Sequence, residues 1–557
     1  MTLSMTDTDT DIQAPTYEKH AKWLGLANMW VGFGAFAAAI PMGLYQVAER
    51  SNLFPAAESR EIYYASVSTH GVLMAYVLTT FFIMGFGYFV ALHSLKQDVW
   101  SPLFSWVGFS IALVGTLTAA VPLLLGQASV MYTFYPPEMA VTSFYIGAAL
   151  LFVGSWFWCV DMIVAMMQWR RANPGMVVPL IMFGTTINAL LWLWTSMGAT
   201  LEVLVQILPV KFGWVDTIDP GLARTFFSWT LHAIVYFWLF PAYIAMYSLM
   251  PRESGGKLFS DELARVAFVM LFIFSVPIGF HHLYMDPQQA AGWKLLHMFG
   301  TFMVAVPTFI TGFTVLATLE ISGRLRGGKG LFGWIMKIRW DNPMTLATML
   351  SMLMLTAGGF GGVINASYQM NALIHNTQWI TGHFHLIFGG TSVIMYFAVA
   401  YWAWPRITGR KLASTRLALW QLWLWFWGML VTTMPWHVLG LLGQPRRVDT
   451  LPYGETLNAI WDPYEVVMFV GAVMLTISAI MFIVVLVRSH FSERLAKTPE
   501  VVFATAIHQP LRVPHLLNSL AFWNWAMLVY MLASYGYPLL QFAFLNAPET
   551  IPFGFGE

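Results

Sequence analysis

Apolar segments long enough to cross a lipid bilayer recur along almost the whole chain, and they constrain its fold more than any other feature. A transmembrane helix needs about 20 mainly apolar residues. Charged residues make up only 10% of the chain, against about 25% in soluble domains. The sequence therefore predicts an all-α polytopic membrane protein. Its thirteen expected helices lie near residues 24–48, 64–93, 103–127, 140–168, 177–208, 223–249, 264–282, 292–320, 343–365, 377–404, 415–441, 464–487 and 516–543.

No stretch between these segments is long enough for a second folded domain. We expect a polar N-terminal tail over 1–23, one transmembrane domain over 24–545 and a C-terminal tail over 546–557. The first residues lack the basic start and the small-residue cleavage site of a secretory signal. Membrane lipid is the expected surrounding, and the net charge of +1 gives no support for a nucleic-acid partner.

The positions of lysine and arginine predict the orientation in the membrane. If thirteen helices alternate from a cytoplasmic N-terminus, the cytoplasmic side carries 21 of the 28 Lys and Arg residues and the outer side carries 7. The positive-inside rule predicts such a bias. An error in one middle helix would invert every later loop and remove the bias. We therefore expect a cytoplasmic N-terminus and an outer C-terminus.

Two histidines in the tenth apolar segment, His383 and His385, are expected to serve two different sites. A step of two residues rotates an α-helix by about 200°, so the two side chains leave opposite faces. His70 in the second segment is a candidate facing ligand, because a haem can be held by histidines from separate helices of a bundle. Ionisable residues at membrane depth are functional candidates because they are costly to bury. A single histidine, however, is more often a hydrogen-bonded core residue.

Three further histidines form a second candidate metal site. His232 lies in the sixth segment, and the adjacent His281 and His282 lie at the end of the seventh. Three imidazoles suit copper, iron or zinc. Tyr236 follows His232 by four residues and projects from the same helix face. A phenol beside a metal can supply a proton and an electron, although spacing alone leaves this pairing open.

Read together, these motifs resemble the catalytic subunit, subunit I, of the haem–copper oxygen reductases. That family is marked by a histidine on the second helix, a His-x-x-x-Tyr, a His-His pair and a His-x-His. This chain carries all four in that order. The segment HAIVYFWLFPAY lacks the proline and glutamate that usually follow this histidine in the A-type branch. The sequence of these motifs is most similar to that of the B-type branch, typified by ba3-type cytochrome c oxidases.

The resemblance implies two haems and one copper ion. His70 and His385 would be axial ligands of a low-spin haem, expected to be b-type, and His383 would bind a high-spin haem, expected to be a-type. Tyr236 would be linked covalently to His232. The residues that would bind copper are His232, His281 and His282. The residues that would lie near the haem propionates are Arg446, Arg447 and His375, and the arginine pair taken alone would be interpreted as a solvated loop.

The resemblance also implies the activity of a proton-translocating terminal oxidase in a prokaryotic plasma membrane, which reduces O2 to water. Positions that match the B-type proton channel are Tyr243, Tyr247, Ser260, Thr311 and Thr314. Without the family these residues are ordinary, because threonines can bond their own helix backbone and tyrosines fill cores.

One position departs from the B-type pattern. Asn371 stands upstream of His375, where an acidic residue near a propionate is expected. This difference puts the details of proton loading and exit in doubt.

The entry of electrons requires another protein. A dinuclear copper centre needs two cysteine thiolates, and the chain has only Cys159. We expect a subunit II that carries this centre and a cytochrome c donor, with quinol as the alternative.

Three other kinds of protein share some of these features. A nitric oxide reductase shares the six histidines but uses iron in place of copper and a glutamate near the position of Tyr236. A cbb3-type oxidase takes its tyrosine from a different helix. A secondary transporter is also polytopic, with polar residues near the midplane, but the sequence shows no repeated halves. Tyr236 therefore favours an oxidase.

Overall fold

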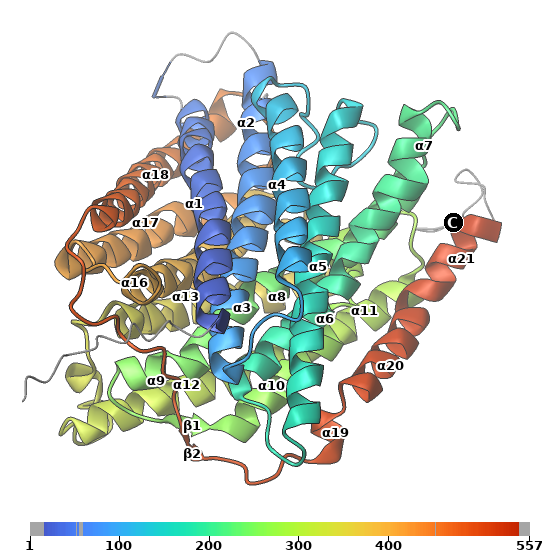
Figure 1. Cartoon of the computed structure of the whole chain (residues 1–557). Coiled ribbons are helices and arrows are strands. Elements are labelled where there is room, and N and C mark those ends of the chain that lie inside the picture. The colour runs from blue at the N-terminus through green and yellow to red at the C-terminus, as the bar shows by residue number, and fades with distance from the viewer. Residues whose placement is uncertain (1–15, 52, 55–59, 450, 452, 545–557) are drawn as a thin grey trace, which may run out of the picture.

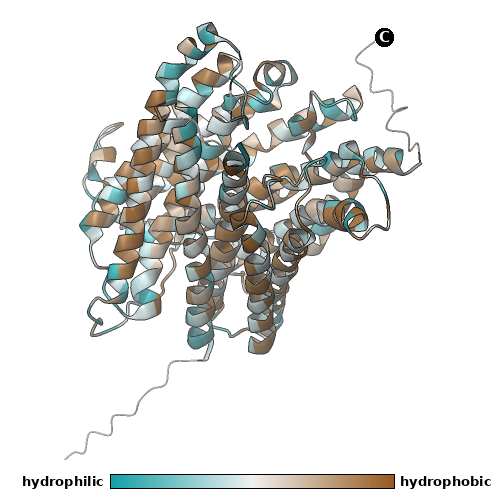
Figure 2. Cartoon of the chain, turned by 90° about the horizontal axis from the view of Figure 1, so that it is seen from above, coloured by the Kyte–Doolittle hydropathy of each residue, from teal (hydrophilic) through white to brown (hydrophobic). Residues whose placement is uncertain are grey.

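Long helices form a bundle that makes up almost all of the regular structure (Figure 1). The computed structural model describes residues 16–51, 53–54, 60–449, 451 and 453–544. Figure 2 shows hydrophobic residues on the outer faces of the helices as well as inside the bundle. Exposed side chains such as Phe309 and Trp420 are apolar, because this surface faces lipid instead of water.

The first half of the chain contains α1 (Thr16–Arg50), α2 (Arg60–Val72), η1 (Leu73–Leu78), α3 (Thr79–Leu95), α4 (Pro102–Leu124), α5 (Thr142–Ala172), α6 (Leu180–Leu201), η2 (Glu202–Ile207), α7 (Leu208–Lys211), α8 (Pro220–Ser248), α9 (Met250–Glu253), β1 (Leu258–Ser260) and α10 (Asp261–Ser275). The second half contains η3 (Phe280–Leu283), α11 (Ala291–Met303), α12 (Ala305–Leu325), η4 (Ile335–Lys337), α13 (Pro343–Ala366), α14 (Tyr368–Ile374), α15 (Gln378–His385), η5 (Leu386–Val393), α16 (Ile394–Thr408), α17 (Thr415–Leu441), α18 (Glu455–His490), β2 (Ala506–His508), α19 (His515–Asn518), α20 (Leu520–Met531), η6 (Leu532–Gly536) and α21 (Tyr537–Phe544).

Among the described residues, twelve helical segments are long and apolar enough to cross a membrane, and they correspond to the first twelve predicted ones. The predicted fold class is confirmed. The thirteenth prediction, 516–543, is occupied mainly by α20, η6 and α21. Of these, α20 packs against α10, η6 against α11 and α21 against α8. The segment is less apolar than the others because it contains Asn524 and several tryptophans and tyrosines. That this segment spans the membrane stays a prediction.

The first and last described helices run in the same direction, as an odd number of crossings would require, and the orientation of the termini stays a prediction. In Figure 1, α1 (dark blue) and the α20–α21 segment (red) both run from the lower to the upper side of the bundle. Helix α1 begins at Thr16, before the predicted apolar stretch, and Lys22 donates a hydrogen bond to Glu18 in its first turns. Residues 1–15 and 545–557 lie outside the described residues, so the division into tails and domain stays a prediction.

Local sequence explains where several helices begin. Asp219, Asn342 and Ser101 each stand immediately before a proline and accept hydrogen bonds from the first helical N–H groups. A polar N-cap followed by proline at the first helical position is a strong start signal, because it satisfies N–H groups that have no partner inside the helix. The cap at Asp219 sets the start of α8, the helix that carries His232 and Tyr236.

Small residues bring neighbouring helices into close contact. A Cβ atom added to Gly147 on α5 would lie 2.6 Å from the backbone of Gly115 on α4, and one added to Gly154 would lie 2.6 Å from that of Gly108. Membrane helices associate through such small residues because lipid gives no hydrophobic drive for helix pairing.

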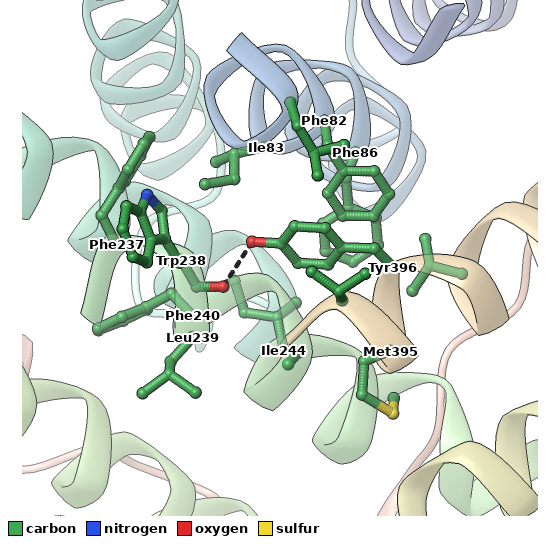
Figure 3. Close-up of a cluster of buried hydrophobic side chains, with 14 of the residues drawn as sticks. Phe82, Ile83, Phe86, Phe237, Trp238, Leu239, Phe240, Ile244, Met395 and Tyr396 are labelled. Carbon is green, nitrogen blue, oxygen red and sulfur yellow. Dashed lines mark hydrogen bonds between the residues drawn. The ribbon is translucent and has the colours of Figure 1, made fainter. Parts of the chain in front are cut away.

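An aromatic cluster joins α3, α8 and α16 in the core of the bundle (Figure 3). Tyr396 stacks on Phe82 with ring centroids 3.9 Å apart, and its hydroxyl donates a 2.6 Å hydrogen bond to the carbonyl of Trp238. Trp238 follows Tyr236 by two residues on α8. The cluster therefore holds the candidate metal-binding part of α8 against the helix that continues from His385.

Two of the candidate histidines stand just before π-helical turns. His385 ends α15 immediately before η5, and His70 lies three residues before η1. Such turns are rare and often mark functional sites, because the extra residue changes the direction of the side chains that follow.

Cysteine labelling tests the predicted orientation. Cys159 is fully buried, so an added cysteine provides the only reactive thiol expected among the described residues. Thr217 and Lys329 are exposed in loops on opposite sides of the bundle in the predicted topology. A membrane-impermeant maleimide added to intact spheroplasts should label Thr217→Cys and leave Lys329→Cys unlabelled, and opened vesicles should label both. Labelling of only Lys329→Cys in spheroplasts would contradict the topology.

Candidate metal centres

A single large cavity of about 1260 Å³ inside the bundle is lined by all six candidate histidines. Its walls come from α1, α2, α8, α12, α13, α15 and α17. The structure thus brings together residues that are far apart in the sequence. They are His70, His232, His281, His282, His383 and His385.

His232, His281 and His282 form a cluster in which the three available ligand atoms all lie within 4.8 Å of one another. No other such group of three His, Cys, Asp or Glu residues occurs in the part of the chain that the structure describes. The Nε2 atoms of His232 and His282 are buried without a hydrogen-bond partner. Unsatisfied buried nitrogens are costly, so the cluster fits a bound metal ion.

One ring nitrogen of His281, Nδ1, is hydrogen-bonded to Thr301 on α11. The Thr301 hydroxyl donates its hydrogen to the carbonyl of His297 at 2.6 Å, so its oxygen accepts from Nδ1 of His281 at 3.1 Å. Metal-binding histidines usually donate their second ring N–H in this way, which fixes the tautomer and the ring orientation. Nε2 of His281 is thereby left free for a metal.

His297 was not among the predicted site residues, and the structure explains its burial without a metal. Its ring stacks on Phe280 at 3.9 Å, accepts a hydrogen bond from the Phe280 N–H and donates one to the carbonyl of Ser534. Both nitrogens are satisfied. His297 therefore supports the η3 turn that presents His281 and His282.

His383 is oriented by α13. Its Nδ1 donates a 2.9 Å hydrogen bond to the carbonyl of Gly358, which leaves Nε2 as the free ligand atom. Gly361 and Gly362 lie against the ring, and a Cβ at those positions would approach it to 3.0 Å and 3.2 Å. The glycines give the imidazole room beside α13.

His70 and His385 face each other in a different part of the cavity. Their rings are 6.4 Å apart and inclined by 23°. Nδ1 of His70 donates to the carbonyl of Ala39, and Nδ1 of His385 donates to that of Thr381. Metal–nitrogen bonds are about 2 Å long, so the gap fits a flat macrocycle whose metal binds both imidazoles.

The structure agrees with the expected divergence of His383 and His385. His383 contacts α13, whereas the ring of His385 faces His70 of α2. On α17, the ring centroid of Trp436 lies 4.8 Å from that of His385. One helix therefore presents imidazoles to two separate sites.

Tyr236 lines the cavity beside the three-histidine cluster. Its ring centroid lies 5.0 Å from that of His232, at an angle of 63°. The shared helix face predicted from the spacing of four residues is present in the structure.

The predicted proton-channel residues lie along facing surfaces of α8 and α12. Tyr243 lines the cavity, and Tyr247 donates a 2.8 Å hydrogen bond to Thr311. Thr314 is buried one turn further along α12. Ser260 caps α10 by accepting a hydrogen bond from the N–H of Leu263.

Thr318, which the sequence did not single out, connects these residues to Ser260. Its hydroxyl accepts from the N–H of Phe259 at 3.0 Å and donates to the carbonyl of Thr314 at 2.7 Å. A threonine on a transmembrane helix has no sequence signal that separates this position from others.

Arg446, Arg447 and His375 line one end of the cavity, called the rim below. Burial, followed by the charge of Arg447, lowers the pKa of Arg446 to about 9. Burial, followed by the charge of Arg446, lowers the pKa of His375 to about 4, so this imidazole is neutral at pH 7. The rim also contains an ion pair that the sequence did not reveal, between Arg224 and Asp286 at 3.1 Å.

Asn371 links this rim to the three-histidine cluster. Its amide N–H groups donate to the carbonyls of His281 and Asn365, and its oxygen accepts from Nδ1 of His375. An ionised carboxylate could not donate to two carbonyls. The departure from the expected acidic residue is therefore matched by a complete set of amide hydrogen bonds.

Comparison with known proteins identifies the family. Residues 23–474 match the family described as Cytochrome C and Quinol oxidase polypeptide I. The chain belongs to this family. It is 37% identical to cytochrome c oxidase subunit 1 of Thermus thermophilus. The alignment spans 536 residues and covers 94% of each chain. The chain is 26% identical to cytochrome c oxidase subunit 1 of Thermostichus vulcanus, over 519 residues that cover 88% of this chain and 89% of the relative.

A solved structure of a heme-copper terminal oxidase dimer has the same fold as this oxidase polypeptide. The two share a TM-score of 0.88 and 34% sequence identity, and the match covers 93% of this chain and 92% of the other. The predicted family, the enzyme class and the membrane location are confirmed. Haem and copper are cofactors of the family, and a subunit II is a partner of subunit I.

The contact between Thr301 and His281 gives a test of the three-histidine site in this oxidase. Thr301→Val removes the acceptor for Nδ1, so the affinity of the site for copper should fall by about 10- to 100-fold. Competition with a copper chelator measures this affinity. Thr356→Val is the matched control, because Thr356 also lines the cavity but bonds only its own helix at Met352. Equal affinities for the two variants would contradict the role of Thr301.

Proposed function

We propose that this subunit catalyses the four-electron reduction of O2 to two water molecules, with four protons consumed, and couples it to proton pumping. The observation that carries the proposal is the presence of two histidine centres in one cavity. Three imidazoles converge within 4.8 Å beside Tyr236, and a separate facing pair lies nearby. A two-centre arrangement separates electron delivery from oxygen chemistry.

We assign the residues as follows. His70 and His385 hold a low-spin b-type haem, and His383 holds a high-spin a-type haem. The residues that hold one copper ion are His232, His281 and His282. When bound, the haems and copper supply the electrons and the site at which O2 is reduced.

Tyr236 supplies a proton and an electron to the reaction. Its edge-on contact with His232, with ring centroids 5.0 Å apart, supports a covalent link between the two side chains. The link would hold the phenol of Tyr236 at the cavity wall. There it would lie between the site of O2 reduction and the hydroxyl groups of the proposed proton route.

Protons reach Tyr236 from the cytoplasmic side through Ser260, Thr314, Thr311, Tyr247 and Tyr243. The hydrogen bond between Tyr247 and Thr311 supports this order. The hydroxyls of Thr314 and Tyr243 are buried without a partner among the described residues, so water molecules complete the route.

Electrons arrive from cytochrome c through a dinuclear copper centre on subunit II. Cys159 supports an external centre, because the single thiol lies fully buried in α5 among apolar residues. Arg446 and Arg447 neutralise haem propionates at the outer end of the cavity, with His375 beside them.

The donor set distinguishes this function from nitric oxide reduction at a non-haem iron. Among the described residues that line the cavity, Glu138 is the only carboxylate, and it lies in the loop before α5. Non-haem iron sites commonly include a carboxylate beside histidine. Tyr236 occupies the position where the reductase would have one.

Metal and haem analysis of the purified complex tests the proposal. Two haems and one copper should be found for each copy of this subunit, because we assign residues to two haem sites and to one copper site of three imidazoles. Pyridine extraction measures haem, and elemental analysis measures copper and total iron. A third iron in place of copper, together with turnover of nitric oxide, would contradict oxygen reduction as the function.

A further inference from the structure

Three buried polar side chains from separate parts of the chain meet at the outer end of α1. Arg50 ends α1 and is 6% exposed, whereas Gln444 in the loop after α17 and Glu465 on α18 are fully buried. Gln444 donates a 2.8 Å hydrogen bond to Oε1 of Glu465. An Nη2 atom of Arg50 lies 3.7 Å from the same oxygen. A buried ion pair is costly to desolvate, so it calls for a specific role.

Arg50 also clamps the loop that carries Arg446 and Arg447. Its guanidinium donates to the carbonyl of Val448 at 2.7 Å and to that of Pro445 at 3.5 Å. The fork geometry of arginine allows one side chain to bridge two acceptors. Arg50 therefore holds, through these hydrogen bonds, the residues on both sides of Arg446 and Arg447.

The loop is held on its other side by the segment that leads into α15. The N–H of Gln378 donates to the carbonyl of Gln444, and the N–H of Arg446 donates to that of Asn376. Arg447 has φ of 60° and Asn376 has φ of 57°. Such left-handed conformations are unfavourable for residues other than glycine and persist only where the surroundings impose them. The contacts of Arg50, Gln444 and Glu465 supply that constraint.

Helix α1 connects this cluster to the facing imidazoles. The carbonyl of Ala39 holds Nδ1 of His70, and a Cβ on Gly43 would lie 2.8 Å from the His70 ring. Arg50 follows Gly43 by seven residues, which places both on one helix face two turns apart. Both line the cavity.

We propose that Arg50 and Glu465, which anchor the Arg446–Arg447 loop, tune the reduction potential of the haem held by His70 and His385 through their opposite charges. The proposal rests on the proposed function, because it needs a haem at that site. A nearby positive charge favours the reduced haem, which carries one less positive charge, and a carboxylate favours the oxidised haem. Charges act strongly in the low-dielectric interior.

Redox titration of the low-spin haem in the purified complex tests this inference. Glu465→Gln should raise the midpoint potential of the low-spin bands, because it removes the negative charge and keeps the shape of the side chain. Arg50→Gln should lower that potential. The high-spin haem should shift less in both variants. Arg60→Gln is the matched control, because Arg60 pairs with Asp449 on the same side but is 74% exposed, and it should leave both potentials unchanged.

A double variant keeps the inference testable if Arg50→Gln alone does not fold with an unpaired buried carboxylate. Arg50→Gln combined with Glu465→Gln leaves no unpaired charge, and its low-spin potential should lie below that of Glu465→Gln alone. Equal potentials in the parent and variants, or shifts of one sign for both charge removals, would overturn the inference. Absence of haem bands from the parent complex would instead overturn the proposed function.

Discussion

In four of the six histidines expected to bind a metal, the protein provides a hydrogen-bond partner for one ring nitrogen, Nδ1. Nδ1 of His70, His383 and His385 donates to a backbone carbonyl, and Nδ1 of His281 donates to Thr301. The second nitrogen of each faces the cavity. Because unpartnered polar atoms are costly inside a membrane protein, the arrangement is stable only with a ligand that accepts these lone pairs. Much of the bundle serves to keep this arrangement in place.

The supporting contacts come from backbone and from small residues as much as from polar side chains. Gly43 and Gly361 leave room for imidazole rings, and the cap at Asp219 sets the start of the helix that carries His232. The stack of Tyr396 on Phe82 holds that helix against α16 (Figure 3).

The features that could be predicted from the sequence are those with a regular period. The length of apolar segments predicts the bundle, and the two-residue step between His383 and His385 predicts their divergence, because both follow from helix geometry alone. The last segment is ambiguous because tryptophan and tyrosine reduce its apolar character. Contacts such as Thr301 with His281, or Arg50 with Glu465, join side chains of different helices, and the second pair lies at opposite ends of the chain. No local pattern marks them, since threonine and arginine occur at many other helix positions.

We infer that one helix, α15, serves two metal centres. Spectra of the variants His383→Ala and His385→Ala test this inference most directly. Reduced-minus-oxidised spectra report the low-spin haem, and carbon monoxide difference spectra report the high-spin haem. We expect His385→Ala to lose the low-spin bands and keep carbon monoxide binding, and His383→Ala to show the reverse. Loss of the same spectral species in both variants would contradict the account.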